Sequence, residues 1–455
     1  MRRWGWLVLL GVGVGWAQDG RVVTEPVIPP VCATLKAELI ARPTSHEGIE
    51  AADEARLDTK RLQKGIDRCG KGEALELAAD GERDAFLSGP LELRAGVTLL
   101  VDKGVTLYGS RNPRDYAVSP GSCGVVNEER AGCRPLIHGD HAAGAGIMGE
   151  GVIDGRGGAK LLVDGKEQGK SWWDLAEEAR SGGHQQVPRL IIFDESDNVT
   201  IYRITLKNSA NFHVTYNHGD GFTVWGLKID TPRRARNTDG VDPGGSKDIT
   251  VTHSFLRDGD DNIAIKGGEG GVTNMTVAHN HFYWGHGMSI GSETYGGVSA
   301  IRVTDLSLDG DDNALRIKSN PTRGGLVEDV VYDDICIRDS KNPILLDTAY
   351  SYPGKGKDLF PVYKNIVFRD VRITGGGKIQ LAGLDTVHRV SVRLDGVLLT
   401  DGAAHYRIVA QHADVAMGPG PVNFAGSGED VTVSGKAGGG SLASCAAKFV
   451  PFPEP

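Results

Sequence analysis

The chain has 455 residues with 50 basic and 59 acidic side chains, a formal charge of −9, and 40% hydrophobic residues. This composition argues against a disordered chain, and the net negative charge without a Lys/Arg-rich block argues against general nucleic-acid binding. Glycine is the exception, because its 64 residues are about twice its usual share. Since no Gly-X-Y period accompanies it, the excess excludes a collagen and indicates many turns.

Residues 1–17 have the pattern of a secretory signal peptide. Two arginines follow Met1, an apolar run extends from Trp4 to Trp16, and Ala17 offers a small residue for cleavage. The run is too short to cross a bilayer of about 30 Å as a helix. We therefore expect a secreted or periplasmic protein with no membrane-spanning segment in its mature form.

The cysteine content fits an oxidising compartment. Six cysteines can pair in many ways, and the sequence does not choose among them. The best single candidate is Cys123 with Cys133, which would close a short loop rich in polar residues. A metal site is less expected, because no Cys-x-x-Cys pair exists. The other four cysteines are Cys32, Cys69, Cys336 and Cys445.

Residues 18–95 are expected to form an N-terminal extension and a helical cap. Their central part, 33–68, has a helical composition, and a solenoid needs a cap at its end. A further helix is predicted at 171–180. Its two tryptophans, Trp172 and Trp173, are expected to pack against the fold rather than to serve as sugar platforms.

Short β-rich runs recur along the second half of the chain, and the first five begin 24 or 26 residues apart. A period in the twenties indicates stacked units, and the leucine pattern of leucine-rich repeats is absent. Val, Ile and Thr indicate strands, while Gly, Asn and Asp between the runs indicate turns. Because parallel connections are almost always right-handed, we predict an all-β, single-domain, right-handed parallel β-helix over residues 96–455. The runs begin near Asn198, Phe222, Asp248, Asn274, Ala300, Asp329, Asn365 and His388.

Four consecutive coils carry ionisable groups at nearly the same place in the repeat. Stacked strands rise about 4.8 Å per coil, so these groups should span about 14 Å on one face, the length of a few sugar rings. A second Asp-Asp pair, Asp311 and Asp312, is interpreted as a turn former. The groups are Asp239 in the first coil, Asp260 and Asp261 in the second, His286 in the third, and Arg316 and Lys318 in the fourth.

The residue types suggest a chemistry. Carboxylates held close together cannot all ionise cheaply, so one keeps its proton while its neighbours stay charged. An acid beside carboxylates that activate water is what glycosidic bond hydrolysis requires. Arg316 and Lys318 alternate on a strand, so both point to one face and suit a sugar carboxylate. Asp260 and Asp261 are adjacent, so both can reach one substrate only if the backbone turns, which Gly259 permits.

At these residues the sequence resembles glycoside hydrolase family 28, the polygalacturonases and their relatives. The resemblance covers roughly residues 97–399 and implies a right-handed parallel β-helix that hydrolyses its substrate with inversion at the anomeric carbon. One departure is Asn262, which stands where many members have Cys. The matching motifs, in the family's order, are NTDG (237–240), GDD (259–261), GHG (285–287) and RIK (316–318).

The resemblance implies a catalytic role for four residues. Asp260 matches the general acid that protonates the leaving oxygen. Asp239 and Asp261 match the pair that activates the attacking water. His286 matches the histidine that supports protonation of the acid.

The resemblance also implies the substrate-binding residues. Arg316 and Lys318 match the residues that bind the galacturonate carboxylate at the cleavage site, and Asn237 is assigned to the same group. Tyr350 matches a substrate-contacting tyrosine, with Tyr352 as the alternative.

Together these features predict a secreted, metal-independent hydrolase of α-1,4-galacturonosyl bonds in pectin or polygalacturonate. We expect a monomer that needs no cofactor and has neither a nucleic-acid nor a membrane partner. One alternative is a Ca²⁺-dependent pectate lyase, because lyases also combine β-helices with acidic clusters. Another is a non-catalytic glycan-binding β-helix, such as an adhesin.

Overall fold

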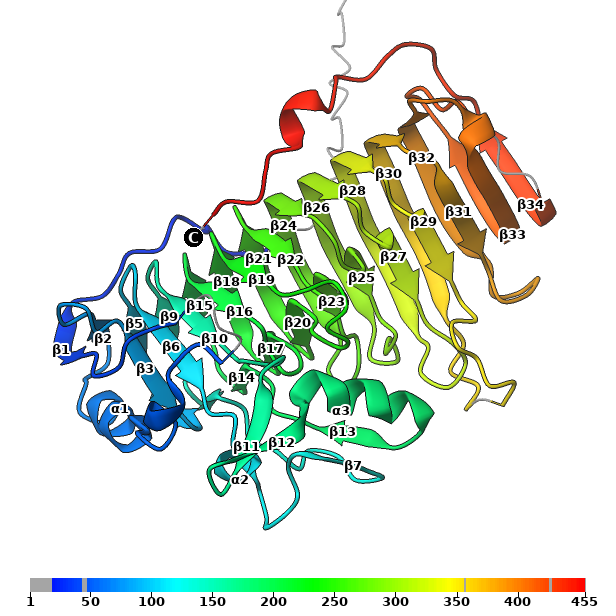
Figure 1. Ribbon diagram of the computed structural model, residues 1–455. Helices are drawn as coiled ribbons and strands as arrows, with labels where there is room; N and C mark the ends of the chain where they lie inside the picture. Colours follow the sequence, from blue (N-terminus) through cyan, green and yellow to red (C-terminus); the bar gives the residue numbers. More distant parts are fainter. Residues whose placement is uncertain (1–18, 43–46, 356, 425–427, 455) are drawn as a thin grey trace, which may run out of the picture.

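The computed structural model describes residues 19–42, 47–355, 357–424 and 428–454, and the predicted signal peptide lies outside them. Across the described part, the chain winds into a parallel β-helix, which confirms the predicted fold class. Its coils stack along one axis, from the blue N-terminal strands to the orange C-terminal strands (Figure 1). None of the helices in this part is long and apolar enough to cross a membrane.

The first column of stacked strands forms the face on which the candidate site lies. Consecutive members pair in parallel from one coil to the next. The strands are β4 (Leu91–Glu92), β8 (Ile137–Asp140), β14 (Ile191–Asp194), β17 (Val214–Asn217), β20 (Val241–Gly244), β23 (Ile263–Ile265), β25 (Met288–Ile290), β27 (Asn313–Lys318), β29 (Asn342–Asp347), β31 (Gly377–Ala382) and β33 (Tyr406–Met417).

Two further columns complete each coil, and they merge into single long strands from β24 onward. The second column is β1 (Val31–Lys36), β2 (Glu73–Ala78), β5 (Val97–Val101), β9 (Gly146–Met148), β15 (Val199–Tyr202), β18 (Asp220–Trp225), β21 (Lys247–Thr252), β24 (Val272–Phe282), β26 (Val298–Asp309), β28 (Leu326–Arg338), β30 (Val362–Thr374), β32 (Val390–Leu399) and β34 (Gly428–Gly435). The third column is β3 (Ala85–Ser88), β6 (Thr106–Gly109), β10 (Val152–Asp154), β16 (Thr205–Lys207), β19 (Lys228–Asp230) and β22 (Phe255–Arg257).

The core lies inside the coils as rows of stacked apolar side chains. In the first column, the same register position is apolar in successive coils, and every member is almost fully buried. Each such side chain contributes about 1.5–3 kcal/mol through burial, so the stack holds neighbouring coils in register. One row consists of Ile191, Val214, Val241, Ile263, Met288 and Leu315.

The recurrence of Asn and Asp at the start of the β-rich runs has a structural reason. Asn198, Asp248, Asn274, Asp329 and Asn365 all have positive φ, between 50° and 56°. Asn and Asp adopt this left-handed conformation more readily than other residues with a side chain. Asn198 lies directly before β15, and the other four lie within the first four residues of β21, β24, β28 and β30. They mark the same corner of successive coils, which explains the repeat seen in the sequence.

Strand pairing begins earlier than the boundary expected at residue 96. β1 pairs with β2, and β2 pairs with β5, so part of segment 18–95 belongs to the main sheet. In the part of this segment that the structure describes, helix is limited to α1 (Thr59–Ile66) and the 3-10 turn η1 (Ala51–Asp53).

The helix predicted at 171–180 is confirmed as α3 (Trp172–Glu178) with the short turn η2 (Ala179–Ser181). Ser171 caps it, because its side chain accepts a hydrogen bond from the Asp174 amide while the Asp174 carboxylate accepts one from the Ser171 amide. Trp172 is fully buried.

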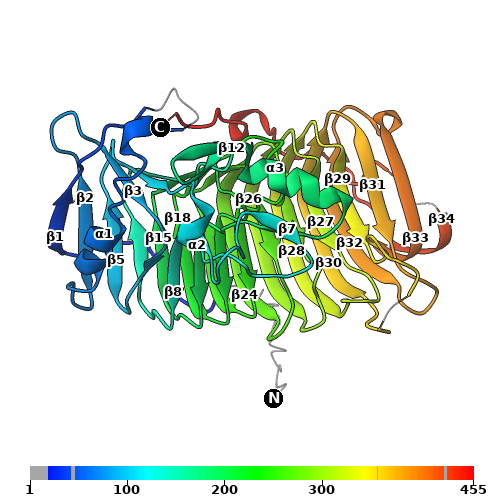
Figure 2. The same ribbon diagram turned by 60° about the horizontal axis from the view of Figure 1, so that its bottom comes forward.

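A wall stands beside the first strand column. It consists of α3, α2 (Pro113–Tyr116), the hairpin β11 (Lys160–Val163) with β12 (Lys166–Ser171), and the pair β7 (Val125–Asn127) with β13 (His184–Gln186). Figure 2 shows these elements in front of the strands.

Three disulfides occur in the described chain, and the predicted bond between Cys123 and Cys133 is one of them. The other two are Cys32–Cys69 and Cys336–Cys445. Cys336–Cys445 ties the C-terminal tail to β28, and the tail runs back along the coils (red in Figure 1). Further along the tail, the ring of Phe452 lies 3.9 Å from the guanidinium of Arg257.

Candidate active site

Neighbouring coils bring the predicted residues together in the first column. β20 pairs with β23 through Val241 and Ile263, and β23 pairs with β25 through Ile263 and Met288. Asp239, Asp261 and His286 each precede one of these residues by two positions. The four motifs that are far apart in the sequence therefore meet on one face, with β27 supplying Arg316 and Lys318 from the next coil.

Asp261 is the centre of a buried ion cluster. Lys318 donates to it through Nζ at 2.9 Å, Arg316 contacts the other carboxylate oxygen, and the Ser289 hydroxyl donates to that oxygen at 3.0 Å. Burial by itself would raise the pKa of Asp261, but the charges of Arg316 and Lys318 lower it well below its usual range. Asp261 is thus held as a carboxylate.

Asp260 lies beside this cluster and has a different partner. His286 Nδ1 is 3.0 Å from its carboxylate, and the Asn237 amide donates to it at 3.4 Å. Burial raises the pKa of Asp260, but the hydrogen bond and charge of His286, together with Lys318, outweigh it and shift the pKa downward. The far side of the imidazole, Nε2, is 3.8 Å from Asp312.

Asp239 is buried next to a second cation. Lys266 Nζ lies 3.5 Å from Asp239 and 3.7 Å from Asp242, which is also buried. Burial and the neighbouring carboxylates of Asp260 and Asp242 raise the pKa of Asp239 well above its usual range. Burial also raises the pKa of Asp242, to about 7. In the free protein, these opposite pKa shifts favour protonation of Asp239 over protonation of Asp260.

The turn that presents both Asp260 and Asp261 is built from its neighbours. The Asp258 carboxylate accepts a hydrogen bond from the Asp260 amide at 3.2 Å and one from the Asn262 side chain at 3.0 Å. Gly259 is required because a Cβ there would lie 1.9 Å from the Ala235 carbonyl oxygen. The backbone does turn before β23, and the need for glycine comes from this close approach.

Asn262 joins two of the motifs. Its side-chain oxygen accepts a hydrogen bond from the Gly287 amide at 3.0 Å, and its amide group donates to the Trp284 carbonyl. The departure from the family's Cys at this position thus adds polar contacts between the turn of Asp260 and the loop of His286.

The NTDG turn is held by a buried histidine and by the wall. His213 Nδ1 lies 3.1 Å from the carbonyl oxygens of Thr238 and Asp239 and donates there. Gln185 of β13 donates to the Asn237 side chain at 3.0 Å. Since Asn237 also contacts Asp260, it connects the wall to the acid cluster.

Of the two candidate tyrosines, Tyr350 is the one in contact with the cluster. Its ring centre lies 5.2 Å from Lys318 Nζ, and its amide donates to the Ser319 carbonyl. A ring face at this distance attracts an ammonium group.

A metal ion would find poor ligands here. Asp260, Asp261 and His286 offer ligand atoms within 4.8 Å of one another. However, Arg316 and Lys318 occupy both oxygens of Asp261, and their charges oppose a cation.

The sequence did not single out Lys266, Asp242 or Gln185, and it assigned Asp312 only to a turn. One signal could have found Lys266. In the ladder of paired strands, it occupies the register position that Lys318 occupies two coils later, with Gly291 between them.

Comparisons with known proteins agree with this geometry. The model of glycosyl hydrolases family 28 matches residues 69–416. The chain is 41% identical to the endo-polygalacturonase of Pectobacterium parmentieri over 388 residues, covering 85% of this chain and 90% of that protein. A polygalacturonase of Ralstonia nicotianae is 37% identical over 491 residues, with coverage of 94% and 92%. A solved polygalacturonase of Erwinia carotovora ssp. carotovora matches with a TM-score of 0.79 and 39% identity, covering 88% of this chain and 100% of that one.

The fold, the carboxylate cluster and these matches define the chain as a glycoside hydrolase. More particularly, the chain belongs to glycosyl hydrolases family 28. The resemblance carried by four short motifs is confirmed over most of the chain.

Proposed function

We propose that the protein hydrolyses α-1,4-galacturonosyl bonds of polygalacturonate and pectin. The observation that carries the proposal is a buried carboxylate, Asp261, held between Arg316 and Lys318 beside Asp239 and Asp260. Such a site offers both a proton and a base, with cations for an acidic sugar close by. The similarity to polygalacturonases, which extends over most of this chain, supports the substrate class.

In the proposed mechanism, Asp260 donates the proton to the leaving oxygen while Asp239 and Asp261 activate the attacking water. Breaking the glycosidic bond leaves the proton of Asp260 on the new hydroxyl. The water adds to the anomeric carbon from the opposite face with inversion, and the proton that it loses passes to the pair Asp239 and Asp261. His286 would return a proton to Asp260 after each cleavage, because its Nδ1 lies 3.0 Å from that carboxylate. In the free protein the same contact lowers the pKa of Asp260. Asn237, Arg316, Lys318 and Tyr350 would bind the substrate, the two cations by pairing with a galacturonate carboxylate.

Because the free protein favours protonation of Asp239, substrate binding must help to move the proton to Asp260. A galacturonate carboxylate drawn to Arg316 and Lys318 adds a negative charge next to Asp260. This like charge raises the pKa of Asp260 and favours its protonated form.

The function is tested by incubating purified protein with polygalacturonate and a chelator. We expect new reducing ends without unsaturated products, and NMR should show the β-anomer first, because inversion of an α-linkage gives a β-product. Unsaturated products that vanish with chelator would indicate the Ca²⁺-dependent lyase. Binding without any turnover would indicate the adhesin-like alternative.

A pH prediction follows from the coupling between substrate and proton. The kcat/KM profile reports the free enzyme and the kcat profile reports the bound complex. Because a bound carboxylate opposes loss of the proton shared by Asp239 and Asp260, the basic limb of kcat should lie at higher pH than that of kcat/KM. Measuring both profiles on polygalacturonate at constant ionic strength checks this, and coincident basic limbs would contradict it.

Export to the periplasm or outside the cell is part of the same proposal, since three disulfides are typical of an oxidising compartment. We also propose that the protein acts as a monomer without a cofactor.

A further inference from the structure

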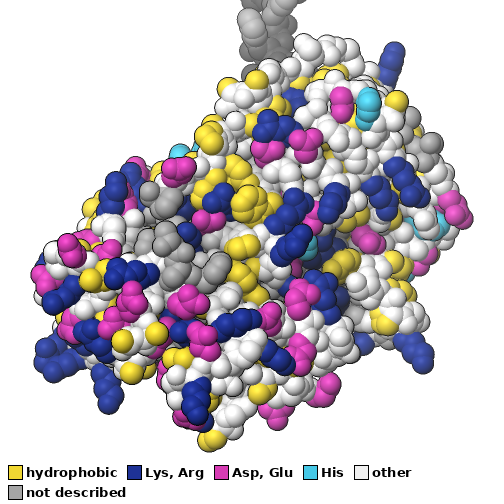
Figure 3. Space-filling model, viewed as in Figure 1, with side chains coloured by type: hydrophobic (Ala, Val, Ile, Leu, Met, Phe, Trp, Pro, Cys, Tyr) yellow, Lys and Arg dark blue, Asp and Glu magenta, His cyan; other side chains and the backbone are white. Residues whose placement is uncertain are grey.

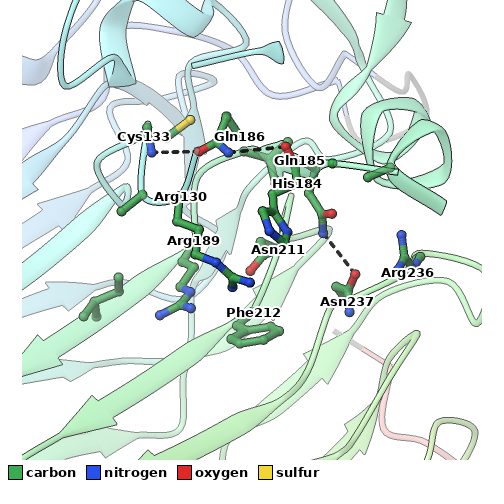
Figure 4. Close-up of a pocket in the computed structure, with 16 residues that line it drawn as sticks. Arg130, Cys133, His184, Gln185, Gln186, Arg189, Asn211, Phe212, Arg236 and Asn237 are labelled. Carbon is green, nitrogen blue, oxygen red and sulfur yellow. Dashed lines mark hydrogen bonds between the residues drawn. The ribbon is translucent and has the colours of Figure 1, made fainter. Parts of the chain in front are cut away.

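A cavity of about 480 Å³ lies between the wall and the first strand column, next to the candidate site. Its lining includes Arg130, His184, Arg189 and Arg236 but no Asp or Glu. Figure 4 shows Arg189, His184 and Phe212 around the opening and Arg236 beside Asn237. Figure 3 shows Lys and Arg side chains gathered near the middle of the same face.

The arginines of this cavity lack the partners that most arginines of the protein have. Among the described residues, Arg130, Arg189 and Arg236 form no ion pair with an acidic side chain. Arg236 donates a hydrogen bond to the Ala176 carbonyl of helix α3 at 2.6 Å. This contact fixes the side chain without neutralising its charge. Asp194 and Asp242 lie close enough to Arg189 to feel its charge, but neither lines the cavity. Positive groups gathered in such a hollow attract an anion.

The cavity borders the candidate site. The Phe212 ring contacts Arg189, 4.7 Å from the ring centre, on the cavity side and Lys266, 5.5 Å away, on the site side. Asn237 lines the cavity and also contacts Asp260. A chain of sugars bound at Asp260 would therefore extend into the cavity.

The wall beside the cavity is braced. β13 carries His184 and pairs with β7, and the Cys123–Cys133 disulfide closes the loop that contains Arg130. The Gln186 side chain accepts a hydrogen bond from the Gly132 amide at 2.8 Å within that loop. The loop of Arg130 and strand β13 thus have fixed supports, as a binding site needs.

We propose that this cavity is a second carboxylate-binding subsite that takes galacturonate units on the side of the scissile bond opposite to Arg316 and Lys318. The inference rests on the proposed function and adds a specificity to it. Units with free carboxylates bind in the cavity, and methyl-esterified units bind there weakly because they lack the charge. Arg189 and Arg236 are the main cationic groups of the subsite.

The test measures binding, so that it does not depend on turnover. In an Asp260→Asn background, hexagalacturonate is titrated by calorimetry with and without Arg189→Gln and Arg236→Gln. Each charge-assisted contact is worth about tenfold or more in affinity, so each substitution should weaken binding at least about tenfold. Arg189→Lys should retain most of the affinity, and fully methyl-esterified hexagalacturonate should bind weakly to every variant.

Arg68→Gln is the matched control, because Arg68 is exposed at the N-terminal end of the β-helix and lines no part of the cavity. It should leave affinity unchanged, and unfolding temperatures should show that all variants are folded. With Asp260 intact, the Arg189 and Arg236 variants should also change which bond of hexagalacturonate is cut. Equal affinities and equal cleavage positions in protein that hydrolyses polygalacturonate would overturn the subsite alone, whereas no binding of any galacturonate oligomer would overturn the substrate class as well.

Discussion

Replacing Asp260 by Asn should lower kcat on polygalacturonate by about 10²–10⁴-fold while the protein stays folded and still binds its substrate. The amide keeps the shape of the side chain but has no proton to give to the leaving oxygen, and general acid catalysis contributes about that factor. His286 and Asn237 contact the carboxylate through separate oxygens, so an amide fits the same space. Initial rates of reducing-end release and calorimetric affinity give the two readouts.

Asp164→Asn is a suitable control for this experiment, because Asp164 is an exposed acid paired with Arg114. It should leave turnover and affinity unchanged. If Asp260→Asn retained most of the wild-type kcat, Asp260 could not be the general acid, and the proton would have to come from a neighbouring carboxyl such as Asp239.

Asp261→Asn should harm both stability and catalysis. The substitution leaves Arg316 and Lys318 buried without their counter-charge. The two cations contact different oxygens of Asp261, and the amide that replaces it has only one oxygen that can accept a hydrogen bond. Removing one partner of a buried ion pair costs about 3–5 kcal/mol. We expect a fall of that size in the free energy of unfolding, measured by denaturant titration, together with loss of turnover at temperatures where the variant is folded.

The matched control is Asp220→Asn, which removes one partner of the more exposed pair between Asp220 and Lys247. Exposed pairs are worth about 0–1 kcal/mol, so this variant should be nearly as stable as the wild type. An Asp261→Asn protein as stable as the control would mean that Arg316 and Lys318 do not depend on this carboxylate.

The repeat and the position of the acids could be predicted because both follow from local rules. Asn and Asp at the corners of the coils supply the left-handed conformation, and a fixed period sends residues such as Asp239 and Asp261 to neighbouring coils. The four motifs could then be aligned without knowing any contact. Lys266 escaped notice because a lysine near the end of a short strand looks like a solvated residue until its neighbours are known.

Other parts could not be predicted because they depend on packing over long distances. β2 has the sequence EALELA, which is rich in residues that favour helices. It nevertheless forms a strand, because it pairs with β1 and β5 and buries Leu75 and Leu77. Gln185 reaches Asn237 from the wall, and pairing of β13 with β7 decides where Gln185 lies. Nothing in their own sequence indicates that pairing.

The stacking of the first column separates the length of the binding face from the geometry of the reacting centre. Each added coil lengthens the binding face by about 4.8 Å and leaves the geometry around Asp260 untouched. Duplication or loss of a coil far from Asp260 would therefore change how many sugar units the protein binds without changing the arrangement of its reacting groups. The architecture makes chain-length preference a modular trait.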